Sequence, residues 1–266
     1  MLEATTEPRG MGKIISIANQ KGGVGKTTTA INLAASLSVA QKRCLLVDCD
    51  PQGNATTGLG FERAAVTKGV YDLIMGDGWG SGIILETLVP DLYLIGSTTA
   101  LVGAEVEIAG LPYKEFRLRD KLRQIKRDYD FILVDCPPSL GFLTINALVC
   151  ADEVLVPLQC EYYALEGLSQ LITTIRAVKR SLNPNIKLGG ILLTMFDVRN
   201  NLSLQVREEV RRHFKSTVFQ TVIPRNVRLS EAPSHGKPVL LYDVRSKGAQ
   251  SYLALAQEIL RKAELP

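Results

Sequence analysis

Short apolar runs alternate along the chain with longer segments in which apolar residues recur at helical spacing. The first run, Ile14 to Ala18, is interrupted only by Ser16, and residues 30–37 follow it with apolar side chains on one helical face. A short continuous apolar run predicts a buried strand, whereas recurrence every three to four residues predicts a helix. The chain is therefore expected to begin with a strand, a loop and a helix.

The same alternation continues to the C-terminus without a linker rich in Gly, Ser or Pro. Further strands are predicted at residues 43–48, 92–95, 131–135, 153–157, 188–194 and 218–223, and helices at residues 70–75, 113–127, 165–180, 204–214 and 250–262. Strands that alternate with helices predict an α/β fold, a doubly wound and mostly parallel sheet with helices on both faces. We expect a disordered extension at residues 1–11 and a single domain over residues 12–266.

The composition narrows the class of protein. With 46% hydrophobic and 22% charged residues, the 266-residue chain has enough apolar material for a sizeable core, which argues against global disorder. No apolar run approaches the roughly 18 residues that a membrane span needs, and the N-terminus lacks the pattern of a signal peptide. The five cysteines show no C-x-x-C spacing, so we expect buried cytosolic thiols, not a disulfide framework or a zinc site.

The loop between the first predicted strand and helix carries the strongest chemical signal. A glycine-rich loop in this context binds phosphate, because glycine lets backbone N–H groups turn inward and the helix N-terminus adds partial positive charge. Lys26 is then expected to reach the β- and γ-phosphates, and the Thr27 hydroxyl to bind Mg²⁺. The predicted phosphate-binding residues are Gly22, Gly23, Val24, Gly25, Lys26, Thr27 and Thr28.

One position departs from the usual pattern G-x-x-x-x-G-K-[ST]. Gln20 stands where the first glycine is expected, and a second lysine, Lys21, follows it. Two lysines around Gly-Gly-Val-Gly resemble the deviant Walker A loop of the ParA/MinD ATPases, relatives of the nitrogenase iron protein and the arsenite-pump ATPase. The resemblance implies that Lys21 reaches across a homodimer interface to the nucleotide of the other subunit. ATP would then hold two subunits together, and its hydrolysis to ADP and phosphate would release them.

Aspartates end two of the predicted strands, at the sheet edge where open α/β folds bind ligands. Asp135 follows four apolar residues and precedes Cys-Pro-Pro, which resembles a Walker B element and the family's D-x-P-P motif. This resemblance implies that Asp135 holds Mg²⁺ through water, that Asp50 orients the attacking water, and that Asp48 supports the metal's water shell. The expected catalytic residues are Lys21, Lys26 and Asp50, and the expected metal site comprises Thr27, Asp48 and Asp135.

Two later segments, residues 194–197 and 223–226, follow predicted strands on the side of the sheet that faces the phosphates. Family members place adenine there, which makes Pro224, Arg225 and Asn226 candidate nucleotide contacts. Residues 51–56 and 222–238 resemble the ParA/Soj group in particular, and the resemblance extends over nearly all of the chain from Met11. Only about a dozen residues precede the first predicted strand, so we expect no helix-turn-helix domain and a short, chromosome-type partitioning ATPase.

Two alternatives stay open. A MinD-like regulator of division-site placement needs a basic amphipathic helix at the C-terminus that lies on a membrane. The last predicted helix has an apolar face with only Arg261 and Lys262 behind it, which favours a helix docked on the core. An iron-protein role lacks support, because neither Cys136 nor Cys160 lies in a glycine-rich setting. A metabolic or transport P-loop ATPase is the other alternative.

Charge is distributed unevenly along the chain. Residues 199–247 contain ten Lys or Arg and four Asp or Glu, a local charge of +6 within a net charge of +4, which suggests a polyanionic partner. Arg199 and Arg228 match arginines that contact the DNA backbone in Soj-like proteins, and Arg245 and Lys247 extend the patch. The resemblance implies a nucleoid-associated cytoplasmic protein whose ATP dimer binds double-stranded DNA without sequence preference, away from any membrane. A ParB-like (Spo0J-like) partner would stimulate hydrolysis.

Overall fold

A seven-stranded sheet runs through the computed structural model, which describes residues 12–76, 78–161 and 164–264. The strands are β1 (Lys13–Ile17), β2 (Cys44–Asp48), β3 (Leu85–Glu86), β4 (Leu92–Ile95), β5 (Phe131–Asp135), β6 (Glu153–Gln159) and β7 (Lys187–Thr194). Their order is β3-β4-β2-β5-β1-β6-β7, and every pairing is parallel except that of β3 with β4. The predicted extension at residues 1–11 lies outside the described residues.

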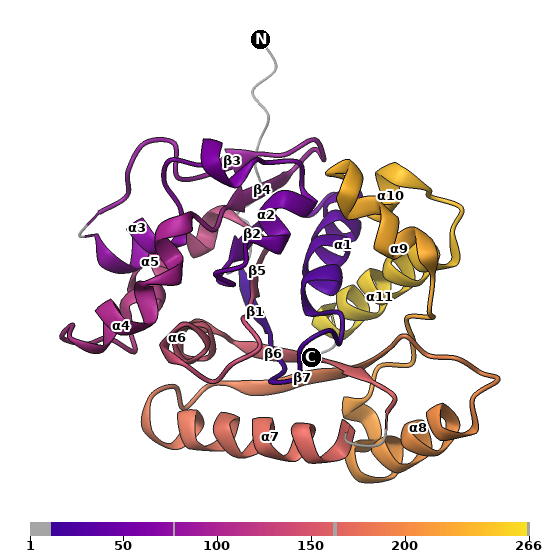
Figure 1. Ribbon diagram of the computed structural model, residues 1–266. Helices are drawn as coiled ribbons and strands as arrows, with labels where there is room; N and C mark the ends of the chain where they lie inside the picture. The colour runs from indigo at the N-terminus through magenta and orange to yellow at the C-terminus, as the bar shows by residue number, and fades with distance from the viewer. Residues whose placement is uncertain (1–11, 77, 162–163, 265–266) are drawn as a thin grey trace.

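Helices cover both faces of this sheet (Figure 1). They are α1 (Lys26–Val39), α2 (Asn54–Gly58), α3 (Val70–Met75), α4 (Ala104–Ala109), α5 (Arg117–Ile125), α6 (Phe142–Cys150), α7 (Ala164–Ser181), α8 (Asn201–Phe214), α9 (Val227–Glu231), α10 (Val239–Tyr242) and α11 (Lys247–Glu264). Helices α1 and α9–α11 pack on one face, and α3–α8 pack on the other. The predicted fold class, a doubly wound and mostly parallel α/β sheet, is confirmed.

The central strands are buried on both faces, which is why they read as continuous apolar runs in the sequence. Successive side chains of a strand point to opposite faces. Ile14 and Ile132 therefore contribute to the core under α3–α8, whereas Ile15, Ile17 and Leu133 contribute to the core under α1 and α11.

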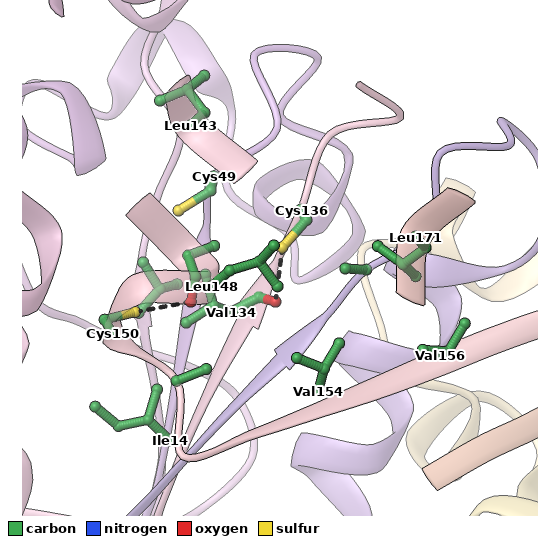
Figure 2. Packing of buried hydrophobic residues seen from close by; sticks show 14 of the residues in the cluster. Ile14, Cys49, Val134, Cys136, Leu143, Leu148, Cys150, Val154, Val156 and Leu171 are labelled. Carbon is green, nitrogen blue, oxygen red and sulfur yellow. Dashed lines mark hydrogen bonds between the residues drawn. The ribbon is translucent and has the colours of Figure 1, made fainter. Parts of the chain in front are cut away.

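All five cysteines are buried and free, as expected from their apolar surroundings. Cys49, Cys136 and Cys150 belong to the core under α3–α8, beside Val134 and Leu143 (Figure 2). Burial raises the pKa of all three thiols, that of Cys150 to about 12. A thiol with a raised pKa carries little thiolate, so these cysteines act as small apolar side chains and not as nucleophiles.

The C-terminal helix α11 is docked on α1, as its apolar face predicted. Tyr252, Leu255, Ala256 and Ile259 are buried in the core that α1 shares with the sheet. Among the described residues, no helix has both the length and the apolar character needed to cross a membrane.

The predicted strand at residues 218–223 is wrong. This segment runs beside β7 but forms only one isolated bridge with it, Ile191 with Val218, and a second bridge, Phe196 with Pro224, lies just beyond both segments. The backbone N–H groups of Gln220 and Thr221 donate to the Glu258 carboxylate at 2.8 and 3.0 Å, so they are not available for a continuous ladder. The sheet therefore ends at β7.

One predicted helix begins later than expected, and one helix was missed. The helix predicted from residue 113 begins only at Arg117, because Tyr113 has a φ of 52°, outside the right-handed helical region. Helix α6 was not predicted at all. Most of its nine residues are buried, among them apolar side chains on several sides, so the sequence shows no apolar face against a polar one.

Close packing between β7 and residue 219 makes Gly190 a test of this arrangement. A Cβ atom at Gly190 would lie 2.2 Å from the Phe219 ring, which is buried. We expect Gly190→Ala to lower the free energy of unfolding by about 1–3 kcal/mol, measured by urea denaturation, because overpacking forces the ring to move. Gly167→Ala is the control. A Cβ there meets nothing within 4 Å in α7, so the same change should raise stability by about 0.5–1 kcal/mol.

Candidate functional site

Three segments that are distant in sequence meet because β2, β5 and β1 are parallel neighbours. In the strand register, Asp135 at the end of β5 lies between Ile17 of β1 and Asp48 of β2. The glycine-rich loop begins after Ile17, and Asp50 follows Asp48 by two residues. Parallel strands end at the same edge, so the loop and the aspartates converge there.

The glycine-rich loop is held open by its backbone and by neighbouring strands. Gly23 and Gly25 have φ values of 73° and 87°, a left-handed conformation that other residues rarely adopt. The buried Asn19 donates from Nδ2 to the carbonyl of Pro157 at 2.7 Å, which ties the start of the loop to β6. Thr194 at the end of β7 donates to the carbonyl of Val24 at 2.8 Å. The loop is thus shaped before any ligand binds.

Lys26 lies at the start of α1 with its side chain largely buried beneath the loop. Its Nζ donates to the carbonyl of Lys21 at 3.1 Å. Burial lowers the pKa of Lys26, and the negative charges of Asp135 and Asp50 are among the groups that partly offset this effect. A buried ammonium that lacks a carboxylate contact is well placed to receive an anion such as phosphate.

The carboxylate of Asp135 is fully buried, and neither of its oxygens has a hydrogen-bond partner among the described residues. Burial raises the pKa of Asp135 well above its usual range, and the neighbouring Asp48 raises it further. The nearby Thr27 hydroxyl, which does not meet hydrogen-bond geometry, and the Lys26 ammonium oppose the shift. An unpartnered buried carboxylate is costly, and a cation removes that cost. The arrangement therefore fits a Mg²⁺ ion near Thr27 and Asp135.

No group of three or more His, Cys, Asp or Glu side chains is arranged to hold a metal ion within the part of the chain that the structure describes. Mg²⁺ commonly takes one or two protein ligands and completes its octahedron with phosphate oxygens and water. The sparse donor set is thus consistent with a metal ion that arrives with a nucleotide.

Asp48 and Asp50 have different surroundings although only one residue separates them. The buried Asp48 carboxylate accepts hydrogen bonds from the backbone N–H and the hydroxyl of Thr56 at 2.8 and 2.6 Å, and burial raises the pKa of Asp48 to about 6. Asp48 thus orders the turn that carries Asp50. Asp50 accepts a bond from the N–H of Gln52 at 2.9 Å and lines the cavity beside the loop. The role of Asp48 in the metal's water shell stays a prediction.

A cavity of about 620 Å³ opens beside the glycine-rich loop. The structure brings many of the predicted nucleotide contacts to its walls, namely Gly22, Gly23, Gly25, Lys26, Thr27, Thr28, Asp50, Pro224, Arg225 and Asn226. Val24 is instead buried, and Lys21 is not among the lining residues. A larger hollow, of about 850 Å³, lies at the amino ends of the strands, where it is lined by lysines and carboxylates. It has no glycine-rich loop, so the smaller cavity is the candidate site.

Met195 belongs to the segment 194–197 that was predicted to lie near adenine, and it lines the cavity with a φ of 48°, a strained conformation for a residue other than glycine. Sequence reasoning missed two residues that shape this cavity. Tyr252 of α11 is buried and its hydroxyl lies 3.1 Å from the Thr29 hydroxyl of α1. Asn32 donates to the carbonyl of Thr28 and accepts from the N–H of Val239. A polar Asn within the apolar residues 30–37 was the only one of these signals visible in the sequence.

The predicted DNA contacts lie in two places. Arg199, in the loop after β7, is 87% exposed and makes two hydrogen bonds to Asp197, at 3.0 and 2.9 Å. Arg228 of α9 pairs with Glu231 at 2.8 Å and with Asp243 at 3.3 Å. The second pair brings Arg228 next to the turn that carries the exposed Arg245 and Lys247.

The first strand of a parallel sheet leads here through a glycine-rich loop into a helix, with a buried lysine in the cavity wall and a buried aspartate near that lysine. This arrangement defines a P-loop nucleotide-binding protein. Comparisons identify the family within this class. A family profile described as "AAA domain" matches residues 12–188.

Two relatives are 58% identical to the chain. "Chromosome partitioning protein ParA" of Myxococcus xanthus matches over 252 residues, 95% of this chain and 89% of the relative. "Sporulation initiation inhibitor protein Soj" of Bacillus subtilis matches over 249 residues, which cover 94% of this chain and 98% of the relative. A solved structure of cobyrinic acid a,c-diamide synthase from Mycobacterium smegmatis with bound ADP and magnesium is 35% identical, with a TM-score of 0.83 and 96% of each chain covered. The chain belongs to the ParA/Soj family of chromosome-partitioning ATPases.

Lys26→Ala tests the assignment of the cavity. The change removes the buried positive charge beneath the loop, so we expect the affinity for a fluorescent ATP analogue to fall at least about tenfold, since a charge-assisted hydrogen bond contributes about 1.5–3 kcal/mol. Lys179→Ala, at the exposed end of α7, is the control for the removal of a positive charge and should bind normally. Unchanged affinity in Lys26→Ala would place the nucleotide elsewhere.

Proposed function

We propose that the chain segregates chromosomes or plasmids by cycling between an ATP-bound dimer on DNA and a released monomer. Residues 12–266 would act as one ATPase domain. The observation that carries the proposal is the convergence of Lys26, Asp50 and Asp135 at one sheet edge, with the second lysine of the loop, Lys21, outside the cavity. The relatives named as partitioning proteins support it over nearly the whole chain.

ATP and Mg²⁺ are the cofactors of this ATPase. The loop amides and Lys26 would bind the phosphates, and Thr27 and Asp135 would hold the metal ion. Phosphoryl transfer needs a placed water and neutralised charge more than covalent chemistry from the protein. Asp50 is the cavity-lining carboxylate that would orient this water, with Asp48 fixing its turn through Thr56.

Lys21 would complete the active site of a second subunit. Its side chain is 39% exposed and does not line the cavity of its own subunit. A positive charge supplied in trans to the phosphates acts as an arginine finger does and accelerates hydrolysis by about 10³–10⁵-fold. A ParB-like partner that stabilises this arrangement would stimulate hydrolysis.

DNA binding would follow from dimerisation. Basic side chains on phosphates give binding without sequence preference, and each neutralised phosphate adds about −0.9 to the log–log salt slope. A dimer presents twice as many basic side chains as one subunit. Asn226 links the two sites, because it lines the nucleotide cavity and also caps α9 by accepting from the N–H of Arg228 at 3.0 Å. A movement of Asn226 caused by nucleotide binding would therefore also move Arg228, which lies two residues further along the chain.

A metabolic P-loop enzyme is the second candidate, since one similar structure is named as a diamide synthase. The relative named as a partitioning protein in Myxococcus xanthus is 58% identical to the chain, against 35% for that structure. An ATP-dependent gel shift on duplex DNA of random sequence separates the two, because a small-molecule enzyme should not retain DNA.

Asp50→Ala tests the hydrolytic role. The variant should bind ATP and dimerise, but its turnover should fall by about 10²-fold or more, since the attacking water loses its positioned carboxylate. Light scattering with ATP should then show a persistent dimer, and the gel shift a persistent DNA complex. Asp120→Ala on the exposed side of α5 is the control. A strictly monomeric Asp50→Ala variant would contradict the mechanism.

Arg228→Gln tests the DNA surface. We expect dimerisation with ATP to stay intact, affinity for all duplex sequences to fall alike, and the salt slope to flatten by about 0.9 for each phosphate that is no longer neutralised. Arg180→Gln at the exposed end of α7 removes the same charge on another part of the surface and should have no effect. Normal DNA affinity of Arg228→Gln at several salt concentrations would exclude Arg228 from the contact surface.

A further inference from the structure

The trans-acting lysine already has a partner on its own subunit. The Lys21 ammonium forms an ion pair with the carboxylate of Glu161, just after the end of β6. The two side chains are 39% and 46% exposed, so the pair lies at the surface of the sheet edge. Lys21 thus points to Glu161, outside the cavity of its own subunit.

The Glu161 carboxylate is itself held in position. Its second oxygen accepts a hydrogen bond from the Gln159 side-chain amide. The backbone N–H of Glu161 donates to the carbonyl of Gln159 at 2.8 Å, and its carbonyl accepts from the N–H of Ala164 at 3.0 Å. These bonds fix the carboxylate between β6 and the start of α7.

The backbone at Lys21 is tied to the same strand. Its N–H donates to Asn19 Oδ1 at 3.0 Å, while the other end of the Asn19 amide donates to the carbonyl of Pro157 in β6. Both the backbone and the side chain of Lys21 are therefore positioned by the end of β6. The ammonium has to leave Glu161 before it can reach phosphates on another subunit.

We propose that Glu161 is a positioning residue that holds Lys21 in a resting state until a second, ATP-bound copy of the chain competes for the ammonium. The proposal rests on the proposed action of Lys21 across the dimer. An exposed ion pair is weak, so the triphosphate, which carries more negative charge than one carboxylate, displaces it. Breaking this weak contact still costs some free energy for each lysine, so the contact raises the concentration at which dimers form. Subunits that have not dimerised then hydrolyse little ATP, because they lack the lysine of a partner.

Glu161→Gln is the test, because it removes the charge and keeps the size of the side chain. With a non-hydrolysable ATP analogue, the dimer dissociation constant measured by sedimentation should decrease by about two- to thirty-fold, since two lysines are freed in each dimer. Glu153→Gln is the matched control. Glu153 pairs with Lys13 at 2.7 Å at the opposite end of the same strand, so removal of its charge should leave dimerisation unchanged.

Unchanged or weaker dimerisation of a Glu161→Gln variant that folds normally would overturn the proposal. In a Lys21→Ala background, Glu161→Gln should have no further effect, because the two residues act through one contact. Lys21→Ala alone distinguishes a failure of the proposed action in trans from a failure of the resting contact. Wild-type dimerisation in Lys21→Ala would refute its action in trans, whereas weak dimerisation there with normal dimerisation in Glu161→Gln would refute only the resting contact.

Discussion

Asp135 is buried between β1 and β2, and no described residue donates a hydrogen bond to either of its carboxylate oxygens. Asp135 lies there because β5, which ends at Asp135, is the parallel neighbour of β1 and β2, and all three strands end at the same edge of the sheet. The nearby Lys26 ammonium supplies part of the missing positive charge. Burial raises the pKa of Asp135 and lowers the pKa of Lys26, so it favours the neutral form of each group. The site is thus electrostatically incomplete without ligands, and a metal ion with a polyphosphate supplies the charges that both groups lack.

The rest of the fold connects this edge to the surfaces proposed for dimerisation and DNA binding. Asn32 and Tyr252 join α1 to the C-terminal helices through hydrogen bonds, so the helix that starts at Lys26 cannot shift without them. Asn226 joins the cavity to α9, and Glu161 joins Lys21 to β6. Each link is one or two hydrogen bonds or ion pairs long. Such short links would let nucleotide binding alter the proposed dimer and DNA contacts without a large rearrangement of the core.

Local sequence determined the strands and the chemistry of the loop. Apolar runs such as Phe131–Asp135 predicted buried strands correctly, because a strand covered on both faces needs apolar residues at every position. The glycine-rich loop was identifiable because left-handed conformations at Gly23 and Gly25 restrict the residue type. Helix α6 escaped prediction because its largely buried surface removes the periodic pattern on which such a prediction depends.

Tertiary structure decided how these pieces work together. The segment at residues 218–223 is apolar enough for a strand, but Glu258 from a distant helix takes two of its N–H groups, and no local pattern encodes that contact. The pairing of Lys21 with Glu161 joins residues 140 positions apart. The sequence by itself determined which residues carry charge and which backbone conformations the loop adopts. Only the folded chain decided their partners, because burial and contact energies depend on residues brought together from separate strands and helices.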